Sequence, residues 1–275
     1  MTIRRDNVQA DSVGPEKLVK SFREARYGFE PFAQQPFSFT LTDGFGDPTG
    51  TTGNENAFNT GYNTFTWHVK GTQTILVPSL TTDGYYNFAL DQTLADGWEL
   101  LVNGNNTVVT GGNQPAHYTM GTDEAFVRLL FSAEDISGVD LIVGFRKVEA
   151  FQADWNDYDE LAGIQVLGDS SSAAAVVNAV NILNNAATNT DDTGETVADA
   201  TDTELLVKIT GRTVTVEVNG ALPSTTPDTF TFDTDEVVTP FVHFLQTTDL
   251  SGELKLQRLE WGLLADYNST TLGTP

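Results

Sequence analysis

Short segments in which apolar and polar residues alternate follow one another along most of the chain. Between residues 84 and 148 they recur about every ten residues, and turn sequences rich in Gly and Asn, residues that accept a positive φ, separate them. The segments are GYYNFAL (84–90), GWELLVN (97–103), NTVVT (106–110), PAHYTM (115–120), AFVRLLF (125–131) and DLIVGFRKV (140–148), preceded by FSFTLT (37–42), TFTWHVK (64–70) and TILVPSL (74–80). This spacing predicts an all-β domain, either a sandwich or a barrel.

The last third of the chain has the clearest strand pattern. Residues 203–222 predict a β-hairpin, with LLVKIT and TVTVEV on either side of a Gly-Arg turn. TFTFDT (229–234) alternates strictly, whereas PFVHFLQT (240–247) and ELKLQRLEWG (253–262) each break the alternation once. A β-bulge is an ordinary cause of such a break, so we expect one in each of these two strands.

Two segments have helical spacing instead. PEKLVKSFREARYGFEPF (15–32) has a Pro suited to a first turn and a Gly suited to a helix end, and predicts a short amphipathic helix. Its apolar face consists of Leu18, Val19, Phe22 and Ala25. This helix either packs on its own domain or docks on a neighbouring molecule. SSAAAVVNAVNIL (171–183) is ambiguous, because Ala favours helix while Val and Ile allow a strand; we predict a helix. We expect the polar stretch 184–204 to be a long loop or ribbon.

The charge is distributed unevenly along the chain. There are 14 basic and 38 acidic residues, a net charge of −24. Six of the basic and four of the acidic residues lie in the first 26, so this arm carries +2 and the remainder −26. An acidic body argues against a surface that tracks phosphates or lies on anionic membrane. There is no Cys, which excludes disulfides and Cys-ligated metals. No apolar run of about 18 residues occurs and the start has no apolar signal region, so we expect synthesis in a cytoplasm without membrane insertion.

The strand patterns of the last third resemble a known family. LVKITGRTVTVEVNG (206–220), FTFD (230–233), TPFVHFLQT (239–247) and ELKLQRLEWG (253–262) are similar to the closing strands of concanavalin A-like jelly rolls, the family of legume lectins and laminin-G domains. YYNFAL, DLIVGFRKVEAF and DYDELAGIQV resemble the middle strands of such domains in virion proteins of tailed bacteriophages. The resemblance covers about residues 84–262 and implies a jelly-roll β-sandwich, while one fold hosts many activities.

The chain departs from the catalytic pattern of this family. Many glycoside hydrolases that resemble this fold place carboxylates as E-x-D-x-E on one strand, so that alternate side chains face one cleft. No such triplet occurs here, and Glu253 and Glu260, seven residues apart, would face opposite ways in a regular strand. The lectin calcium and manganese site also has no residue-by-residue match. We therefore predict that the protein is not an enzyme.

Other candidate sites have ordinary structural alternatives. Two acidic stretches offer oxygen ligands for calcium: Asp154, Asn156, Asp157, Asp159 and Glu160 form the first, and Asp191, Asp192 and Glu195 the second. A solvated loop is the alternative explanation for both. We expect no cofactor other than this candidate calcium. Trp155 and Tyr158 lie three residues apart and could stack on a sugar, with core packing as the alternative. The three histidines are far apart in sequence: we expect His68 to be a solvated strand residue, and His117 and His243 to be structural.

These observations lead to one architecture and two functional hypotheses. We predict an N-terminal arm (1–36), a jelly-roll β-sandwich (37–265) and a C-terminal tail (266–275). The first hypothesis, implied by the resemblance, is a virion capsid decoration (cement) protein without enzymatic activity, on the capsid surface, that contacts the major capsid protein and its own copies. Its predicted contact residues are Arg4, Arg5, Leu18, Lys20, Phe22, Arg23, Phe29 and Phe32. The alternative is a lectin-like module that binds host-surface glycans, with Trp155 and Tyr158 in the site.

Overall fold

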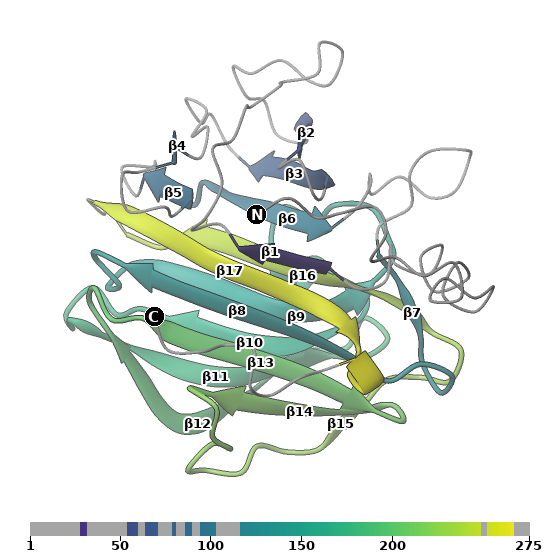
Figure 1. Ribbon diagram of the computed structural model, residues 1–275. Helices are drawn as coiled ribbons and strands as arrows, with labels where there is room; N and C mark the ends of the chain where they lie inside the picture. Colours follow the sequence, from purple (N-terminus) through teal and green to yellow (C-terminus); the bar gives the residue numbers. More distant parts are fainter. Residues whose placement is uncertain are drawn as a thin grey trace, which may run out of the picture.

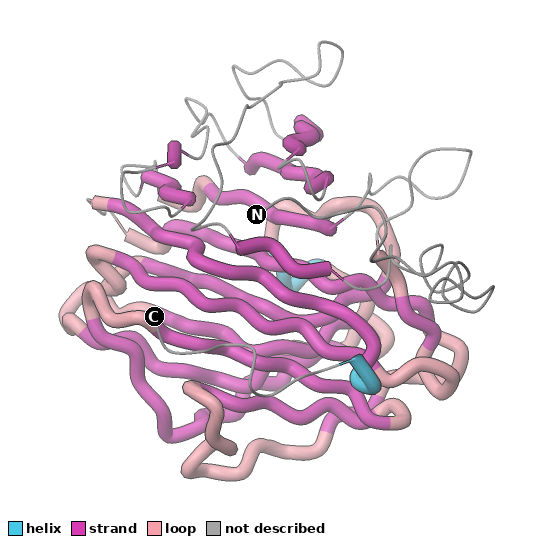
Figure 2. Tube along the Cα trace, viewed as in Figure 1, coloured by secondary structure: helices cyan, strands magenta, loops and turns pink. Residues whose placement is uncertain are grey.

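The chain folds into two antiparallel β-sheets that lie face to face (Figure 1). The computed structural model describes residues 28–31, 54–59, 64–70, 79–80, 86–89, 94–102, 116–248 and 252–266. Figure 2 shows that strands dominate these residues; two 3-10 turns, Trp155–Asp157 and Leu264–Asp266, are the only helical elements among them. No helix within the described ranges is long and apolar enough to cross a membrane.

Sheet A lies in front in the view of Figure 1. Its strands, in spatial order, are β15 (Phe230–Thr231), β14 (Thr213–Val218), β13 (Thr203–Thr210), β8 (Ala125–Ala133), β17 (Glu253–Leu263), β5 (Tyr86–Ala89) and β4 (Ser79–Leu80), and β1 (Gly28–Pro31) also pairs with β17. Neighbours such as β8 and β17 are far apart in sequence, as Greek-key and jelly-roll connections require.

Sheet B lies behind sheet A. Its strands, in spatial order, are β12 (Asn189–Ala198), β11 (Ala174–Ile182), β10 (Leu161–Leu167), β9 (Val139–Lys147), β16 (Val237–Gln246), β6 (Gly97–Val102), β3 (Thr64–Lys70) and β2 (Asn54–Asn59), and β7 (Tyr118–Thr119) also pairs with β16. Sheet B has two faces of different character: one faces sheet A, and the other, called here the outer face, faces away from it.

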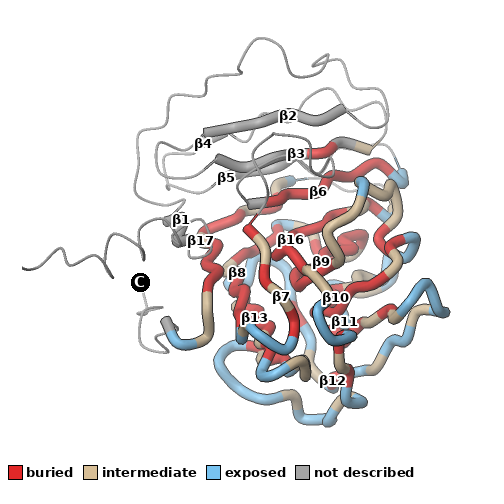
Figure 3. Tube along the Cα trace, turned by 90° about the vertical axis from the view of Figure 1, so that its right-hand side faces the viewer, coloured by how far each residue is buried: buried red, intermediate tan, exposed pale blue. Residues whose placement is uncertain are grey.

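The hydrophobic core lies between the sheets. Alternate residues of each strand point inward, for example Leu141 and Val143 of sheet B and Val127 and Leu129 of sheet A, all at most 1% exposed. Figure 3 shows buried residues (red) concentrated in both sheets, while β12 and the turns carry most of the exposed positions. The predicted β-sandwich is therefore confirmed, and its alternation has the expected cause, since successive strand residues point to opposite faces.

The predicted hairpin and one predicted bulge are present. β13 and β14 pair from Leu205↔Val218 to Thr210↔Thr213, and Gly211 in the turn has φ +65°, which suits glycine. The pairing of β17 with β8 shifts between Leu256 and Arg258, as the broken alternation predicts. β16 pairs with β9 without a shift. The alternation of β16 breaks for another reason, because its residues on the outer face of sheet B are buried as well as those that face sheet A.

The predicted helix at 171–183 is wrong. This segment is strand β11, whose Ala175, Val177 and Ala179 point into the core while Val180 and Ile182 on the outer face are also buried. A strand buried on both faces loses the strict apolar–polar alternation, and its alanines then imitate a helical pattern. The polar stretch 184–204 contains strand β12, so the ribbon alternative holds there.

Most of the predicted N-terminal arm lies outside the described residues. This applies to Arg4, Arg5, Leu18, Lys20, Phe22, Arg23 and Phe32, and to the predicted strands 37–42 and 106–110. Phe29 is in β1, where it pairs with Glu260 of β17. Residues 28–31 therefore belong to sheet A, although they were predicted to belong to a separate arm.

Candidate functional site

A row of polar residues crosses the outer face of sheet B at right angles to the strands. Residues directly opposite each other in antiparallel strands place their side chains on the same face, and the register aligns one residue from each of seven neighbouring strands. The row consists of His68 (β3), Glu99 (β6), His243 (β16), Ile142 (β9), Gln165 (β10), Asn178 (β11) and Asp192 (β12). Only Ile142 is apolar.

The connection between β9 and β10 lies over half of this row. Residues 148–160, called here the covering segment, contact side chains of four strands. Phe151 stacks on His68 of β3 with ring centroids 4.9 Å apart, and Tyr158 packs edge-on against Phe241 of β16. Because of this cover, outer-face residues such as Leu101 of β6 are fully buried.

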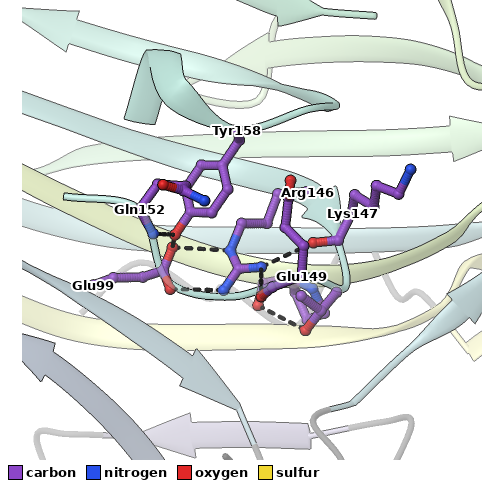
Figure 4. A network of polar contacts seen from close by, with 8 residues as sticks. Glu99, Arg146, Lys147, Glu149, Gln152 and Tyr158 are labelled. Carbon is purple, nitrogen blue, oxygen red and sulfur yellow. Dashed lines mark hydrogen bonds and ion pairs between the residues drawn. The ribbon is translucent and has the colours of Figure 1, made fainter. Parts of the chain in front are cut away.

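A network centred on Glu99 fixes the covering segment to the sheet (Figure 4). The Arg146 guanidinium donates to both carboxylate oxygens of Glu99, from Nε at 2.9 Å and from Nη2 at 2.8 Å. The Tyr158 hydroxyl donates to Glu99 at 2.6 Å and accepts from the backbone N–H of Gln152 at 3.2 Å. Arg146 also lies 4.5 Å from the centroid of the Tyr158 ring and donates to the Lys147 carbonyl. Charge-assisted two-point pairs of this kind hold their geometry well.

A second chain of hydrogen bonds runs toward the other end of the row. Trp155 Nε1 donates to Asp140 at 3.1 Å, and Gln165 donates to the other oxygen of Asp140 at 2.8 Å. Asn178 in turn donates to Gln165 at 3.2 Å. Asp192, at the end of the row, is exposed. Gln165 and Asn178 are buried, so the row becomes exposed only at Asp192.

The two histidines of the row are buried, at 3% for His68 and 1% for His243. Among the described residues, no hydrogen-bond partner is present for either ring nitrogen of His243 or for Nε2 of His68. Burial lowers the pKa of each imidazole from 6.5 to about 4, so both are neutral near pH 7. The prediction of a solvated His68 is wrong, because Phe151 covers its ring.

The carboxylates of the site have shifted pKa values of opposite direction. Burial alone would raise the pKa of Glu99, but the charge and hydrogen bonds of Arg146 outweigh it and hold this pKa below its ordinary value. Burial raises the pKa of Asp140, which has only neutral donors. Burial likewise raises the pKa of the Tyr158 hydroxyl well above its ordinary value. Glu99 is therefore a fixed buried charge, paired within the protein.

Trp155 and Tyr158 do not form the exposed sugar-stacking surface that their spacing suggests. Trp155 is 9% exposed and Tyr158 is fully buried, and both polar atoms bind carboxylates of the sheet. Core packing, the alternative explanation, describes both rings. Their spacing of three does bring them to the same side of a short 3-10 turn, toward the outer face of sheet B.

The acidic stretches lie where predicted but bond within the protein. Asp154 pairs with Lys70, and the backbone N–H of Asp233 donates to Glu160. Asp191 accepts from the backbone of Asp228, and Glu195 accepts from that of Ser224. Over the described ranges, no three His, Asp or Glu side chains are placed to hold a metal ion.

Glu99 and Arg146 were not predicted as residues of this site, and His243 was predicted to be structural. Glu99, His243 and Arg146 lie on strands that are distant in sequence, and only the register aligns Glu99 with His243. The signal that could have indicated them is a polar residue at an outer-face position within an otherwise apolar strand, as in GWELLVN and PFVHFLQT.

The fold is similar to that of carbohydrate-active proteins. No protein-family model matches the sequence, and no curated protein sequence is significantly similar to it. A β-glucanase of Bacillus licheniformis matches 86% of this chain and 98% of its own, at 10% identity and a TM-score of 0.41. A GH43B protein of the Bacteroides ovatus xyloglucan locus matches at 11% identity and TM-score 0.43; the chain aligns over 86% of its length with 39% of that protein. A galectin of Caenorhabditis elegans matches 54% of this chain and 91% of its own, at 13% identity and TM-score 0.31.

These similarities concern the fold. The predicted jelly-roll β-sandwich is confirmed by the two antiparallel sheets themselves, and none of the similar structures named here is a virion protein. The prediction that the protein is not an enzyme is contradicted, since several of the similar structures, including the β-glucanase and an endo-β-galactosidase of Clostridium perfringens, are glycoside hydrolases. The prediction relied on finding catalytic carboxylates on one strand, whereas this sheet aligns polar side chains from different strands.

Proposed function

We propose that this chain is a carbohydrate-binding domain whose ligand lies across the strands of sheet B on the outer face. The polar row carries this proposal. At its β12 end the exposed Asp192 carboxylate can accept hydrogen bonds from sugar hydroxyls, and the amides of Asn178 and Gln165 lie next to it. Neighbouring strands are about 4.8 Å apart, so β10 to β12 span roughly 10 Å, which suits a short oligosaccharide.

The β12 end of the row, where Asp192 is exposed, is the binding end in this proposal. Gln165 and Asn178 beside it are 4% and 6% exposed, and a hydrogen bond from Asn178 to Gln165 orients their amides. Val176, two residues before Asn178 on the same face of β11, is 44% exposed and offers apolar surface for the C–H groups of a sugar ring. Preoriented amides beside a small apolar surface are typical of small-molecule sites.

The β-glucanase and the galectin named above illustrate that carbohydrate proteins use this fold, and their similarity to this chain extends to the fold alone. Capsid decoration stays a prediction, because it depends on a contact arm that is mostly outside the described residues.

Affinity electrophoresis of the whole chain through gels containing plant, algal and bacterial polysaccharides tests the proposal. We expect retention by at least one polysaccharide, and at least tenfold weaker retention for the double variant Asn178→Ala/Asp192→Ala. The control is Asp169→Asn, which changes an exposed carboxylate in the turn after β10. Release of reducing ends is measured in the same samples, since hydrolysis would require a bound glycan.

Two outcomes would overturn the proposal. One is the absence of retention by every polysaccharide of the panel. The other is retention that the double variant leaves unchanged, or that the control reduces equally. Circular dichroism of each variant identifies any loss of folding, and in that case the single variant Asp192→Ala, at an exposed position, replaces the double variant.

A further inference from the structure

The covering segment lies directly on two buried histidines. His68 and His243 flank Glu99 on the outer face, one on each neighbouring strand. Phe151 of the covering segment stacks on His68 with ring planes 11° apart, and His243 is 1% exposed. The described residues provide no hydrogen-bond partner for either nitrogen of His243, so a protonated imidazole there would be a buried cation with unpaired donors.

We propose that the covering segment is released by acid: protonation of His68 and His243 displaces residues 148–160 from the outer face of sheet B while the two sheets stay folded. This uncovers Glu99, Arg146 and the covered half of the polar row. The proposal does not require a carbohydrate ligand, because the movement is measured in the protein alone.

The covering segment is held by fewer interactions than the sheets are. Between its two ends, its contacts with the sheet include the Tyr158–Glu99 and Trp155–Asp140 hydrogen bonds, the Asp154–Lys70 ion pair, and ring contacts such as Phe151 on His68. Its backbone hydrogen bonds to neighbouring elements lie at the ends, at Val148, Asp159 and Glu160. The strands beneath it are paired along ladders of five to nine residues, the longest being β9 with β16. Segments with few backbone pairs open at lower free energy than sheet cores do.

Charged groups from every neighbouring element act on the two histidines. Glu99 of β6 favours their protonation, while Arg146 of β9 opposes it. His243 is also opposed by Lys70 of β3 and favoured by Asp154 of the covering segment. Burial exceeds all of these effects and keeps both rings neutral when the segment is closed.

Carboxyl groups close to the two histidines also affect the pH at which the covering segment opens. Glu99, whose pKa is held low by Arg146 despite burial, also favours opening as it becomes protonated. Burial raises the pKa of Asp140 and of Glu149 in the covering segment, so their protonation favours the closed form. An exposed histidine titrates near 6.5, so protonation of His68 and His243 favours opening as pH falls below 6.5, and protonation of Asp140 and Glu149 opposes it.

The difference in histidine pKa between the closed and the open form gives the size of the shift in the opening equilibrium. With a pKa of about 4 when closed and about 6.5 when open, each histidine shifts the equilibrium toward the open form about 30-fold between pH 8 and pH 5. Two such groups give about 900-fold at the same pH if they act independently.

Fluorine NMR of the whole chain labelled with 5-fluorotryptophan tests the proposal. The variant Trp155→Phe assigns the resonance of Trp155, the tryptophan of the covering segment. We expect this resonance to move to a solvent-exposed position between pH 6.5 and 4, while those of the sheet residues Trp98 and Trp261 stay unchanged. Movement of all four tryptophan resonances together would show global unfolding and overturn the proposal.

Histidine variants identify the groups that act. We expect His68→Gln to reduce the acid response of Trp155 by about tenfold or more at pH 5, and His68→Gln/His243→Gln to abolish it. His117→Gln, which changes the histidine outside the covered row, should leave the response unchanged. An unchanged response in His68→Gln would overturn the proposal. This single variant is sufficient if the double variant does not fold.

Discussion

Arg146 on β9 and Glu99 on β6 form a two-point ion pair that reaches over the intervening strand β16. Nε and Nη2 of Arg146 lie 2.9 and 2.8 Å from the two carboxylate oxygens, and neither side chain is exposed. The pair connects β9 and β6 of sheet B beneath the covering segment. Because each group is already paired with the other, this charge pair stabilises the fold and is not available to bind a ligand.

Removing one member of this pair should be costly. We expect Glu99→Gln to lower the free energy of unfolding by about 3–5 kcal/mol, because it leaves the Arg146 charge buried without a counter-charge. Urea denaturation at pH 7 measures this change. The control Glu217→Gln breaks the partly exposed Lys208–Glu217 pair on sheet A and should cost about 1 kcal/mol or less. Equal losses in the two variants would contradict the prediction.

The Tyr158 hydroxyl should stabilise the folded protein through its two hydrogen bonds. We expect Tyr158→Phe to destabilise the protein by about 1–3 kcal/mol, since Glu99 and the Gln152 N–H each lose a buried partner. Burial raises the pKa of this hydroxyl, so it should not ionise with the other tyrosines. Absorbance titration at alkaline pH should therefore give the same amplitude for wild type and variant until unfolding. A smaller amplitude in the variant would show that Tyr158 is accessible.

Stability should fall with acidification because of the two buried histidines. Each has a pKa of about 4 when folded, against 6.5 when unfolded, so protons bind the unfolded chain more tightly. The stabilisation is fully present above about pH 6.5 and is lost as pH falls toward 4, by up to about 3 kcal/mol per histidine and by less once the covering segment has opened. Urea denaturation at several pH values measures the slope. His68→Gln should reduce it and His117→Gln should not; a slope that is the same in all three proteins would rule this out.

Gly144 of β9 and Gly163 of β10 lie opposite each other, where the strands approach closely. A Cβ on Gly144 would come within 2.3 Å of the Ala162 carbonyl oxygen, so backbone would have to move. We expect Gly144→Ala to lower the free energy of unfolding by about 1–3 kcal/mol or to prevent folding. Thermal denaturation measures this. In Gly211→Ala the new methyl group meets no atom within 4 Å, and only the cost of a positive φ, about 1 kcal/mol, should appear.

The sequence predicted the strands that face solvent on one side. β13 and β14 alternate apolar and polar residues, their turn carries Gly211, and the bulge of β17 appears as one break in its alternation. These features depend on neighbours in sequence or on one buried face, which local patterns record. The predicted helix at 171–183 failed for the opposite reason, because β11 is buried on both faces.

The all-β class, the resemblance to jelly rolls and the excess of negative charge could thus be predicted from the amino-acid order. Which polar residues share a face depends instead on how the strands are paired. Glu99, His243 and Arg146 meet because antiparallel register places distant strands side by side, and no local pattern encodes that register. The burial of His68, Trp155 and Tyr158 is also decided by the tertiary structure, since a 13-residue connection, 148–160, folds back over the sheet. Contacts between distant segments determine both the register and the cover.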